Sequence, residues 1–458
     1  MCSSDLEASL DGISVTGLGD ISISANTLNV EVNRANSMQP VIDWAAAPLV
    51  VKTGPATSIT LNMDGQSGNL LRASGNLKLN AAGFFAVEGS FGIERKTDTI
   101  KLQGSNNDVL VDLLTIGAVG LSAFVGLNGG TINAAGLALT GVEFGLAIAS
   151  RRTEPSKKYS ALRATATGAG VTGISGVTLS SSNLAVSLNR PDSAGTVMNL
   201  AADPLDVLSG PGRSVTLDFA GSAGALVQAS GTMNIGVESF FTLSGSFALQ
   251  KATQTLKDGS GADVDVDLLT LGGEDLNAFA GLNGGTANAV GLSLADAGFA
   301  LAIATSKTDS TKTWRALVAD AGSAGFVGPE NIELSATSVK VAINRPAADG
   351  SLINFNAAPL TVATGPATTR VINFNSADGA LLEASGSLKL NLSNFVQLSG
   401  DLAIRKANAT LKLSTGTDVS TEVLAIGGTN LSAFAGINGG TPNAIGLFIR
   451  VCQIPCPD

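Results

Sequence analysis

Hydrophobic and polar residues alternate along most of this chain. The segments LNVEV (28–32), ITLNM (59–63), LKL (77–79) and FGLAI (144–148) place large side chains at every second position. A period of two residues is typical of a β-strand with one packed face. Turn sequences separate these runs, among them TGP at 53–55, DG at 64–65, NGG at 128–130 and DGSG at 258–261. Because no window shows a capped 3.6-residue apolar stripe, the pattern predicts an all-β fold with few and short helices.

The same pattern returns at a long fixed interval. LSAFVGLNGGT at 121–131 recurs as LNAFAGLNGGT at 276–286 and as LSAFAGINGGT at 431–441, in two steps of 155 residues. The pair NR at 33–34 recurs at 189–190 and 344–345, and GP at 54–55 recurs at 210–211 and 365–366. The chain is therefore a tandem array, which we divide into repeats at 13–168, 169–323 and 324–447, the last one truncated.

A weaker period is visible inside each copy. Similar alternating runs begin at Leu184, Phe247, Phe299 and Val339, which indicates a hairpin-like unit that was multiplied and then diverged. We expect such hairpins of antiparallel strands to stack into an elongated solenoid-like array, each burying its apolar face against the next. The uneven spacing of the runs leaves a second architecture open, a string of separate β-sandwich domains.

The two ends depart from the repeat. Residues 1–6 (MCSSDL) read like a non-native leader, and 448–458 form an atypical tail without a counterpart in the other copies. All three cysteines, Cys2, Cys452 and Cys456, lie in these segments. We interpret the chain as a fragment of a longer protein, cut within a repeat.

Composition narrows the function. Charged residues make up 14% of the chain and apolar residues 44%, which is the opposite of a disordered segment. The net charge of −10 disfavours nucleic acid and anionic membranes as partners. The repeats contain neither His nor Cys, so thiolate metal sites, Ser-His triads and Cys-His pairs are excluded from them. We predict that the chain is not an enzyme and that it needs no cofactor.

Calcium is the one metal that the composition leaves open, because its ligands are oxygen atoms. Asp258, Asp263, Asp265 and Asp267 lie around a glycine-rich turn that could gather several carboxylates. The alternative is that these residues form solvated acidic turns, since neither an EF-hand loop nor a calcium-binding nonapeptide is present.

We interpret the recurrent aromatic residues and Asn-Arg pairs as structural rather than functional positions. Tyr159 and Trp314 are equivalent, as are the residues at 44, 200 and 355 and the phenylalanines at 124, 279 and 434. Tolerance for size at a fixed period is typical of core positions, although an exposed aromatic platform for sugar or lipid is an alternative. The Asn-Arg pairs, two of which precede Pro191 and Pro346, are expected to end strands.

One uncharged stretch is long enough for a transmembrane helix. Residues 113–142 carry no charge, but the stretch is rich in glycine and asparagine, and copy two has Glu274 and Asp275 at the same register. We therefore expect no transmembrane segment here.

The motifs FAL at 247–249, LNAFAGLNGG at 276–285 and NRP at 189–191 resemble the long tandem repeats of giant, adhesin-like secreted or surface proteins of bacteria. The resemblance implies an extracellular or cell-surface segment without catalytic residues. We expect a structural or adhesive role, with neighbouring repeats as the first partners and a cell-surface glycan, lipid or protein as a further one. The alternative function is a β module that binds lipid or carbohydrate.

Overall fold

The computed structural model describes residues 4–15, 21–35, 40–81, 85–105, 107–128, 131–328 and 332–450. The three cysteines, residues 1–3 of the expected leader and residues 451–458 of the expected tail lie outside these ranges. Residues 4–6 lie in the first strand and 448–450 in the last strand. The chain divides into two compact units, one of residues 1–175 and 180–229, the other of 176–179 and 230–458.

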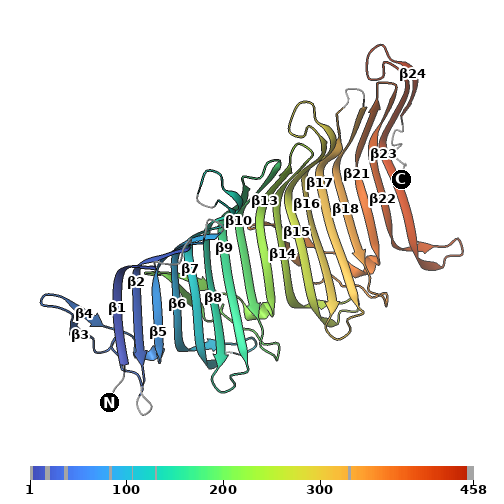
Figure 1. Ribbon diagram of the computed structural model, residues 1–458. Coiled ribbons are helices and arrows are strands. Elements are labelled where there is room, and N and C mark those ends of the chain that lie inside the picture. Colours follow the sequence, from blue (N-terminus) through green and yellow to red (C-terminus); the bar gives the residue numbers. More distant parts are fainter. Residues whose placement is uncertain are drawn as a thin grey trace. The chain divides into compact units, whose positions relative to one another are not determined.

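The first unit is an antiparallel sheet of long strands, joined in chain order except where short segments intervene (Figure 1). Its long strands are β1 (Ser4–Val15), β2 (Ile21–Arg34), β5 (Leu70–Ala81), β6 (Phe85–Lys101), β7 (Asp108–Leu127), β8 (Ala135–Arg151), β9 (Lys158–Thr172) and β10 (Val177–Arg190), whose first three residues belong to the second unit. Two small hairpins and two 3-10 turns complete it: β3 (Leu49–Lys52) with β4 (Ser58–Leu61), η1 (Gly65–Ser67), β11 (Leu205–Gly210) with β12 (Arg213–Leu217), and η2 (Gly221–Ala223).

The second unit repeats this design. Its long strands are β13 (Leu226–Val237), which begins in the first unit, β14 (Phe241–Lys257), β15 (Asp263–Leu282), β16 (Val290–Ser306), β17 (Thr313–Val327), β18 (Ile332–Arg345), β21 (Leu381–Leu392), β22 (Val396–Lys412), β23 (Asp418–Ile437) and β24 (Ile445–Arg450). The small hairpin of β19 (Leu360–Ala363) and β20 (Thr369–Ile372), and η3 (Ser376–Asp378), lie in the chain between β18 and β21, which pair directly.

The predicted all-β class and antiparallel hairpins are confirmed. Among the described residues there is no α-helix, and the helical turns are the three short η elements. The uncharged stretch 113–142 forms parts of β7 and β8. No helix in the described ranges is long and apolar enough to cross a membrane.

An inserted hairpin explains the longest interval of the weaker period. Leu184, Phe247, Phe299 and Val339 lie in β10, β14, β16 and β18, which are alternate long strands. The longest interval, from Leu184 to Phe247, contains the additional hairpin β11–β12 and η2. The multiplied element is thus one pair of long strands, interrupted once per copy by a small hairpin.

In each unit a hairpin lies on one face of the sheet and makes a second layer. Hairpin β11–β12 belongs to the second sequence repeat and packs on β6, β7 and β8 of the first. Hairpin β19–β20 belongs to the third repeat and packs on β14, β15 and β16 of the second. We call such a hairpin-on-sheet contact a seam. Each seam joins two successive sequence repeats.

The main core of the second unit lies at its seam. Val266 and Leu268 of β15 are buried there together with Val362 and Ile372 of the hairpin. Trp314 and Phe355 belong to the same cluster, and Tyr159 and Leu200 are buried in the first unit. Phe434 is buried as well, and Trp44 packs on a small cluster of Leu61, Met63 and Leu70. The structure therefore confirms these recurrent aromatic positions as packing positions.

Candidate functional site

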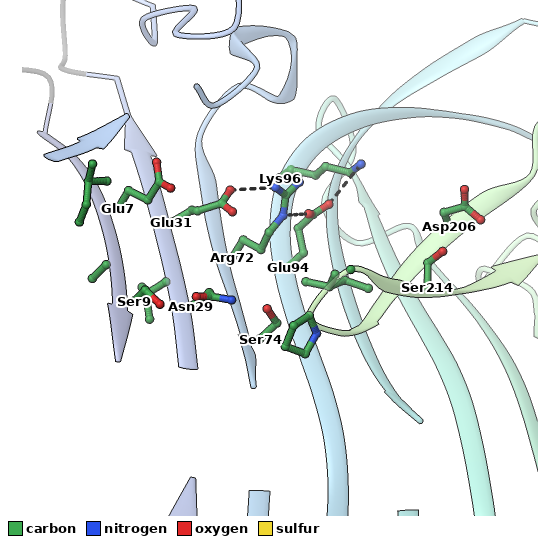
Figure 2. A pocket seen from close by; sticks show the side chains of 16 residues that line it. Glu7, Ser9, Asn29, Glu31, Arg72, Ser74, Glu94, Lys96, Asp206 and Ser214 are labelled. Atoms are coloured by element: carbon green, nitrogen blue, oxygen red, sulfur yellow. Dashed lines mark hydrogen bonds and ion pairs between the residues drawn. The ribbon is translucent and has the colours of Figure 1, made fainter. Parts of the chain in front are cut away.

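One cavity lies in the first unit, between the sheet and hairpin β11–β12 (Figure 2). Its volume is about 630 Å³, and it is open to solvent. Strands β1, β2, β5 and β6 form its floor, and Leu208, Pro211 and Ser214 of the hairpin form its opposite wall. The lining is mixed, with hydroxyl and amide groups beside charged side chains.

A chain of alternating charges crosses the floor of this cavity (Figure 2). Arg72 on β5 donates to Glu31 on β2 over 2.8 Å and to Glu94 on β6 over 2.5 Å. Lys96 continues the chain, with its Nζ atom 3.2 Å from Glu94 and 3.0 Å from Asp98. The sheet register explains the arrangement, because Arg72 lies opposite Glu31 on one side and Glu94 on the other.

Burial and partners act in opposite directions on the two cations. Burial by itself lowers the pKa of Arg72, but the charges of Glu94 and Glu31 and their hydrogen bonds outweigh it and hold this pKa above its usual value. For Lys96, burial likewise lowers the pKa, and the carboxylates of Glu94 and Asp98 more than compensate. Both cations therefore stay charged at neutral pH, within a network that is largely satisfied internally.

Glu7 on β1 is the exception in this network. It lies directly opposite Glu31 in the sheet register. Partial burial, followed by the negative charge of Glu31, raises the pKa of Glu7. Its Oε2 atom is buried without a hydrogen-bond partner in the described structure. The surroundings of the Glu7 carboxyl thus disfavour its ionised form.

The ion-pair chain is not kept in the second copy, whereas the third copy has Glu383 and Arg405 at the positions of Arg72 and Glu94. The residues equivalent to Glu31, Arg72, Glu94 and Lys96 in the second repeat are Ser187, Gln228, Gln250 and Ala252. A cavity of this kind can hold a polar ligand through hydrogen bonds, but its lining contains neither histidine nor cysteine and no aromatic ring.

The four aspartates considered for calcium each have protein partners. Oδ1 of Asp258 accepts hydrogen bonds from the backbone N–H of Ser260 and Ala262 and from the Ser260 hydroxyl, and the hydroxyl bond is the main cause of its lowered pKa. This is how a carboxylate caps a turn. Asp263, Asp265 and Asp267 lie at alternate positions on β15.

Each of the three strand aspartates contacts a side chain of the neighbouring strand β14. Asp263 lies 2.6 Å from Lys257 Nζ, and Asp265 accepts from the hydroxyl of Thr255. Asp267 accepts from the hydroxyl of Thr253. In the described part of the chain, no three His, Cys, Asp or Glu side chains are grouped so that they could hold a metal ion.

The Asn-Arg pairs end strands as the sequence predicts. β2, β10 and β18 end at Arg34, Arg190 and Arg345, respectively. The asparagines of the first two pairs have a role that the sequence did not reveal. Asn189 is buried and donates from Nδ2 to the carbonyl of Met198 at 2.8 Å. Asn33 makes the equivalent bond to Ile42, so a buried carboxamide fixes the chain where it leaves the sheet.

The sequence analysis did not predict the seams, although a recurrent glycine marks them. Gly117 on β7 and Gly272 on β15 are equivalent in the repeat. A Cβ atom at either position would lie under 3.0 Å from a backbone carbonyl of the hairpin, that of Leu208 or of Ala363. Only glycine lets the hairpin approach the sheet this closely.

Charged contacts flank both seams. In the first unit, Arg163 on β9 pairs with Asp218 and lies over the ring of Phe219 at 5.1 Å. In the second unit the arginine is on the hairpin. Arg370 binds both carboxylate oxygens of Glu274 at 2.7 Å and also pairs with Asp320. The cation thus lies on the sheet in the first seam and on the hairpin in the second, and the carboxylates lie on the opposite side in each case.

Comparison with known proteins identifies no family. No protein-family model matches the chain, and no curated protein matches it. Among solved structures, the chain is similar to Wzi of Escherichia coli, an outer membrane protein involved in group 1 capsule assembly and described as a carbohydrate-binding β-barrel. The identity is 9% and the TM-score 0.16, over 89% of this chain and 83% of that chain. A TM-score this low does not establish a common fold, and no conclusion rests on it.

Proposed function

We propose that this chain is a non-catalytic structural and adhesive repeat segment of a large extracellular bacterial protein. In such a segment, repetition supplies length and many weak contacts supply avidity. The observation that carries the proposal is the seam. In each unit a hairpin from one sequence repeat completes the core of the repeat before it.

Interlocking of this kind suits an array in which each repeat depends on its neighbour. Val362 and Ile372 of the hairpin, and Leu268 of the strand beneath it, are buried only because two successive repeats meet. We infer that the copies stack into an elongated solenoid-like array rather than into separate β-sandwich domains. Sealed sandwich domains would bury their apolar faces without residues from the next copy.

Composition supports an extracellular setting. The repeat body has no cysteine, so its folding does not depend on redox conditions. The net charge of −10 favours solubility of the chain after export. The buried groups support the absence of catalysis, because the ion pairs of the first-unit cavity neutralise one another.

Small-angle X-ray scattering on the full chain tests the structural role. A compact protein of this length has a radius of gyration of about 23 Å. A spacer should give a clearly larger value with a constant cross-section over its length. A value near the compact one would refute the elongated array and, with it, the spacer role.

A second candidate function is supported by the cavity of the first unit. Glu7, Ser9, Asn29 and Ser74 line it together with the ion-pair chain, and these groups suit a glycan better than a lipid because they offer hydrogen bonds. A glycan array tests this function. Binding that is lost in Arg72→Met and kept in Arg405→Met, an exposed arginine outside the cavity, would support it. An array without any binding would remove this candidate.

A further inference from the structure

In the second unit, the sheet face opposite the seam carries large apolar side chains in register. One row crosses six neighbouring strands, each residue lying opposite the next, and consists of Leu249, Leu271, Leu301, Leu317, Ile343 and Leu382. Two residues further along the strands, a second row consists of Phe247, Gly273, Phe299, Ala319, Val341 and Ala384. We call these the apolar rows, and this side of the sheet the open face.

The open face is not a seam that lacks its hairpin. Hairpin β19–β20, which the following repeat supplies, packs on the other face of the same strands. On β16 and β17 that covered face carries small residues, among them Ala302 and Ala316, whereas the open face carries Leu301 and Leu317. Leu249 remains 39% exposed. These two strands therefore place their larger side chains toward solvent, which is the reverse of an ordinary antiparallel sheet.

The first unit contains the same row. Its members lie opposite one another on β6 to β10, and they are Ile93, Ile116, Leu146, Leu162 and Leu188. They are the equivalents of the first five members in the second unit, and every one of these positions is Leu or Ile in both copies. Recurrence of large aliphatic residues on a solvated face indicates that the face contacts an apolar partner.

A line of cations borders the apolar rows at one margin. Lys251, Arg315 and Arg345 each lie on the open face, two residues along the strand from a member of the first row. All three are exposed, and among the described residues none of them has an ion-pair partner. Two of these positions are also cationic in the first unit, as Arg95 and Arg190. Unpaired cations beside an apolar surface favour a partner that has an anionic group at that margin.

The dimensions of the open face suit a lipid. The cation line and the second apolar row are four residues apart along a strand, which is about 13 Å. The acyl chains of one membrane leaflet extend about 15 Å, half the hydrocarbon thickness of a bilayer. Beyond the cations the face becomes polar, with Thr253, Asp267, Thr305 and Thr313 opposite one another. An acyl chain can therefore lie along the strands with its head group among the cations.

We propose that the open face of each unit binds monomeric acidic lipid. The acyl chain lies on the apolar rows, and in the second unit Lys251, Arg315 and Arg345 contact the negatively charged head group. This ligand adds to the proposed structural and adhesive role and does not depend on it.

Two other occupants fit the open face less well. A bilayer surface is disfavoured because Tyr159 and Trp314, the residue types that anchor proteins at membrane interfaces, are buried. The net charge of −10 also opposes approach to an anionic membrane. A second copy of the chain would bring the same cations to the contact and no line of carboxylates to neutralise them.

Equilibrium dialysis of the full chain against oleoyl-lysophosphatidylglycerol, below its micelle concentration, tests the proposal. We expect saturable binding, with the neutral oleoyl-lysophosphatidylcholine bound about tenfold more weakly because it lacks the net charge. Absence of saturable binding overturns the proposal. Equal affinity for the two lipids overturns the assignment of the cations to the head group.

A pair of substitutions in the apolar rows locates the acyl chain. Leu146→Thr with Leu301→Thr changes equivalent positions of the two units, and threonine is well tolerated in strands. Affinity for both lipids should fall about fivefold or more. The control, Leu137→Thr with Leu292→Thr, lies on the same strands nine residues away, roughly 30 Å. It should bind like the unchanged chain, and equal binding by both pairs would remove the apolar rows as the site.

A charge variant locates the head group. It combines Arg95→Gln, Arg190→Gln, Lys251→Gln and Arg345→Gln, and it should lose the preference for the acidic lipid while still binding the neutral one. A control with the same change in net charge alters cations of the covered face or of hairpin β11–β12, namely Lys78→Gln, Arg213→Gln, Lys389→Gln and Arg405→Gln. An equal loss of preference in this control would attribute the effect to net charge and overturn the head-group contact.

Two further measurements decide between the occupants, and thermal unfolding confirms that each variant is folded. Sedimentation with phosphatidylglycerol vesicles, in the absence of monomer binding, would overturn the proposal in favour of a membrane surface. Sedimentation velocity that shows a dimer which excludes the lipid would assign the open face to a second copy of the chain.

Discussion

Strands β15 and β23 have the same length and equivalent sequences, yet one is core and the other is surface. Along one face of β15, Val266, Leu268 and Thr270 are buried, and each is less than 7% exposed. The equivalent residues on β23, at 421, 423 and 425, are exposed or half-buried. The sheet beneath them is formed in the same way, since β14 pairs with β15 and β22 with β23 in matching registers.

The difference between them is the hairpin β19–β20, which covers β15 and has no counterpart over β23 in the described residues. A period of two therefore determines which side chains share a face but not whether that face is buried. The sheet alone holds its strands through hydrogen bonds, and the hairpin adds the hydrophobic contribution. Four measurements test whether the hairpin causes the difference between β15 and β23.

The largest difference is expected for truncation of the equivalent aliphatic residues. Leu268→Ala should lower the free energy of unfolding by about 2–5 kcal/mol, because it leaves a cavity between strand and hairpin. Val423→Ala should change it by less than about 1 kcal/mol, since solvent already reaches that position. Urea denaturation of both variants measures this. Equal losses would mean that the hairpin does not define the core.

The paired glycines should respond in opposite ways to an added side chain. Gly272→Val forces the carbonyl of Ala363 away and should cost about 1–3 kcal/mol. Gly427→Val meets open space and should have almost no cost. Thermal unfolding compares the two. A tolerated valine at 272 would show that the hairpin can shift without loss of packing.

The arginines of the two regions differ in burial and partners. Arg370→Met removes a bidentate contact with Glu274 and leaves that carboxylate, only 22% exposed, without its partner. A loss of about 1–3 kcal/mol is expected. Arg405 lies 3.4 Å from Glu383, and both side chains are well exposed, so Arg405→Met should cost about 0–1 kcal/mol. Denaturation in low and high salt separates the two contacts, because only the exposed pair should be screened fully.

The smallest effect concerns pH. Hydrogen bonds from Ser387 and then from Asn430 lower the pKa of Asp401 on β22. The equivalent residue on β14, Ser246, does not titrate. Because the folded-state pKa is depressed, the stabilisation by Asp401 is present above its ordinary pKa and is lost as pH falls through the folded value.

Hydrogen exchange tests this expectation. Amides of β22 and β23 should lose protection below about pH 4 more than those of β14 and β15. Asp401→Ser should remove that difference. A difference that persists in the variant would assign the acid sensitivity to another group.

The sequence predicted the elements better than their contacts. Alternation located strands such as β2 and β8, and the NR pairs located strand ends, because both depend on neighbouring residues. The seams could not be predicted in this way. Leu208 lies on Gly117, about ninety residues earlier in the chain, and nothing local indicates which face a hairpin will cover.

The charged cavity was missed for the same reason. Glu31, Arg72 and Glu94 lie far apart in the sequence, on separate strands, and look like solvated positions. Only the register between β2, β5 and β6 brings them together. The calcium hypothesis considered residues close in sequence, whereas the structure gives each of those aspartates its own local partner.

Because each seam hairpin comes from the following repeat, the core of one repeat is completed only after the next repeat has been synthesised. A ribosome or an export channel releases β15 well before residues 360–372, which follow Leu268 by about ninety residues and require that much more chain to emerge. Until they arrive, β15 exposes the apolar face that hairpin β19–β20 later covers. The core of a seam is therefore completed only when the following repeat has been made.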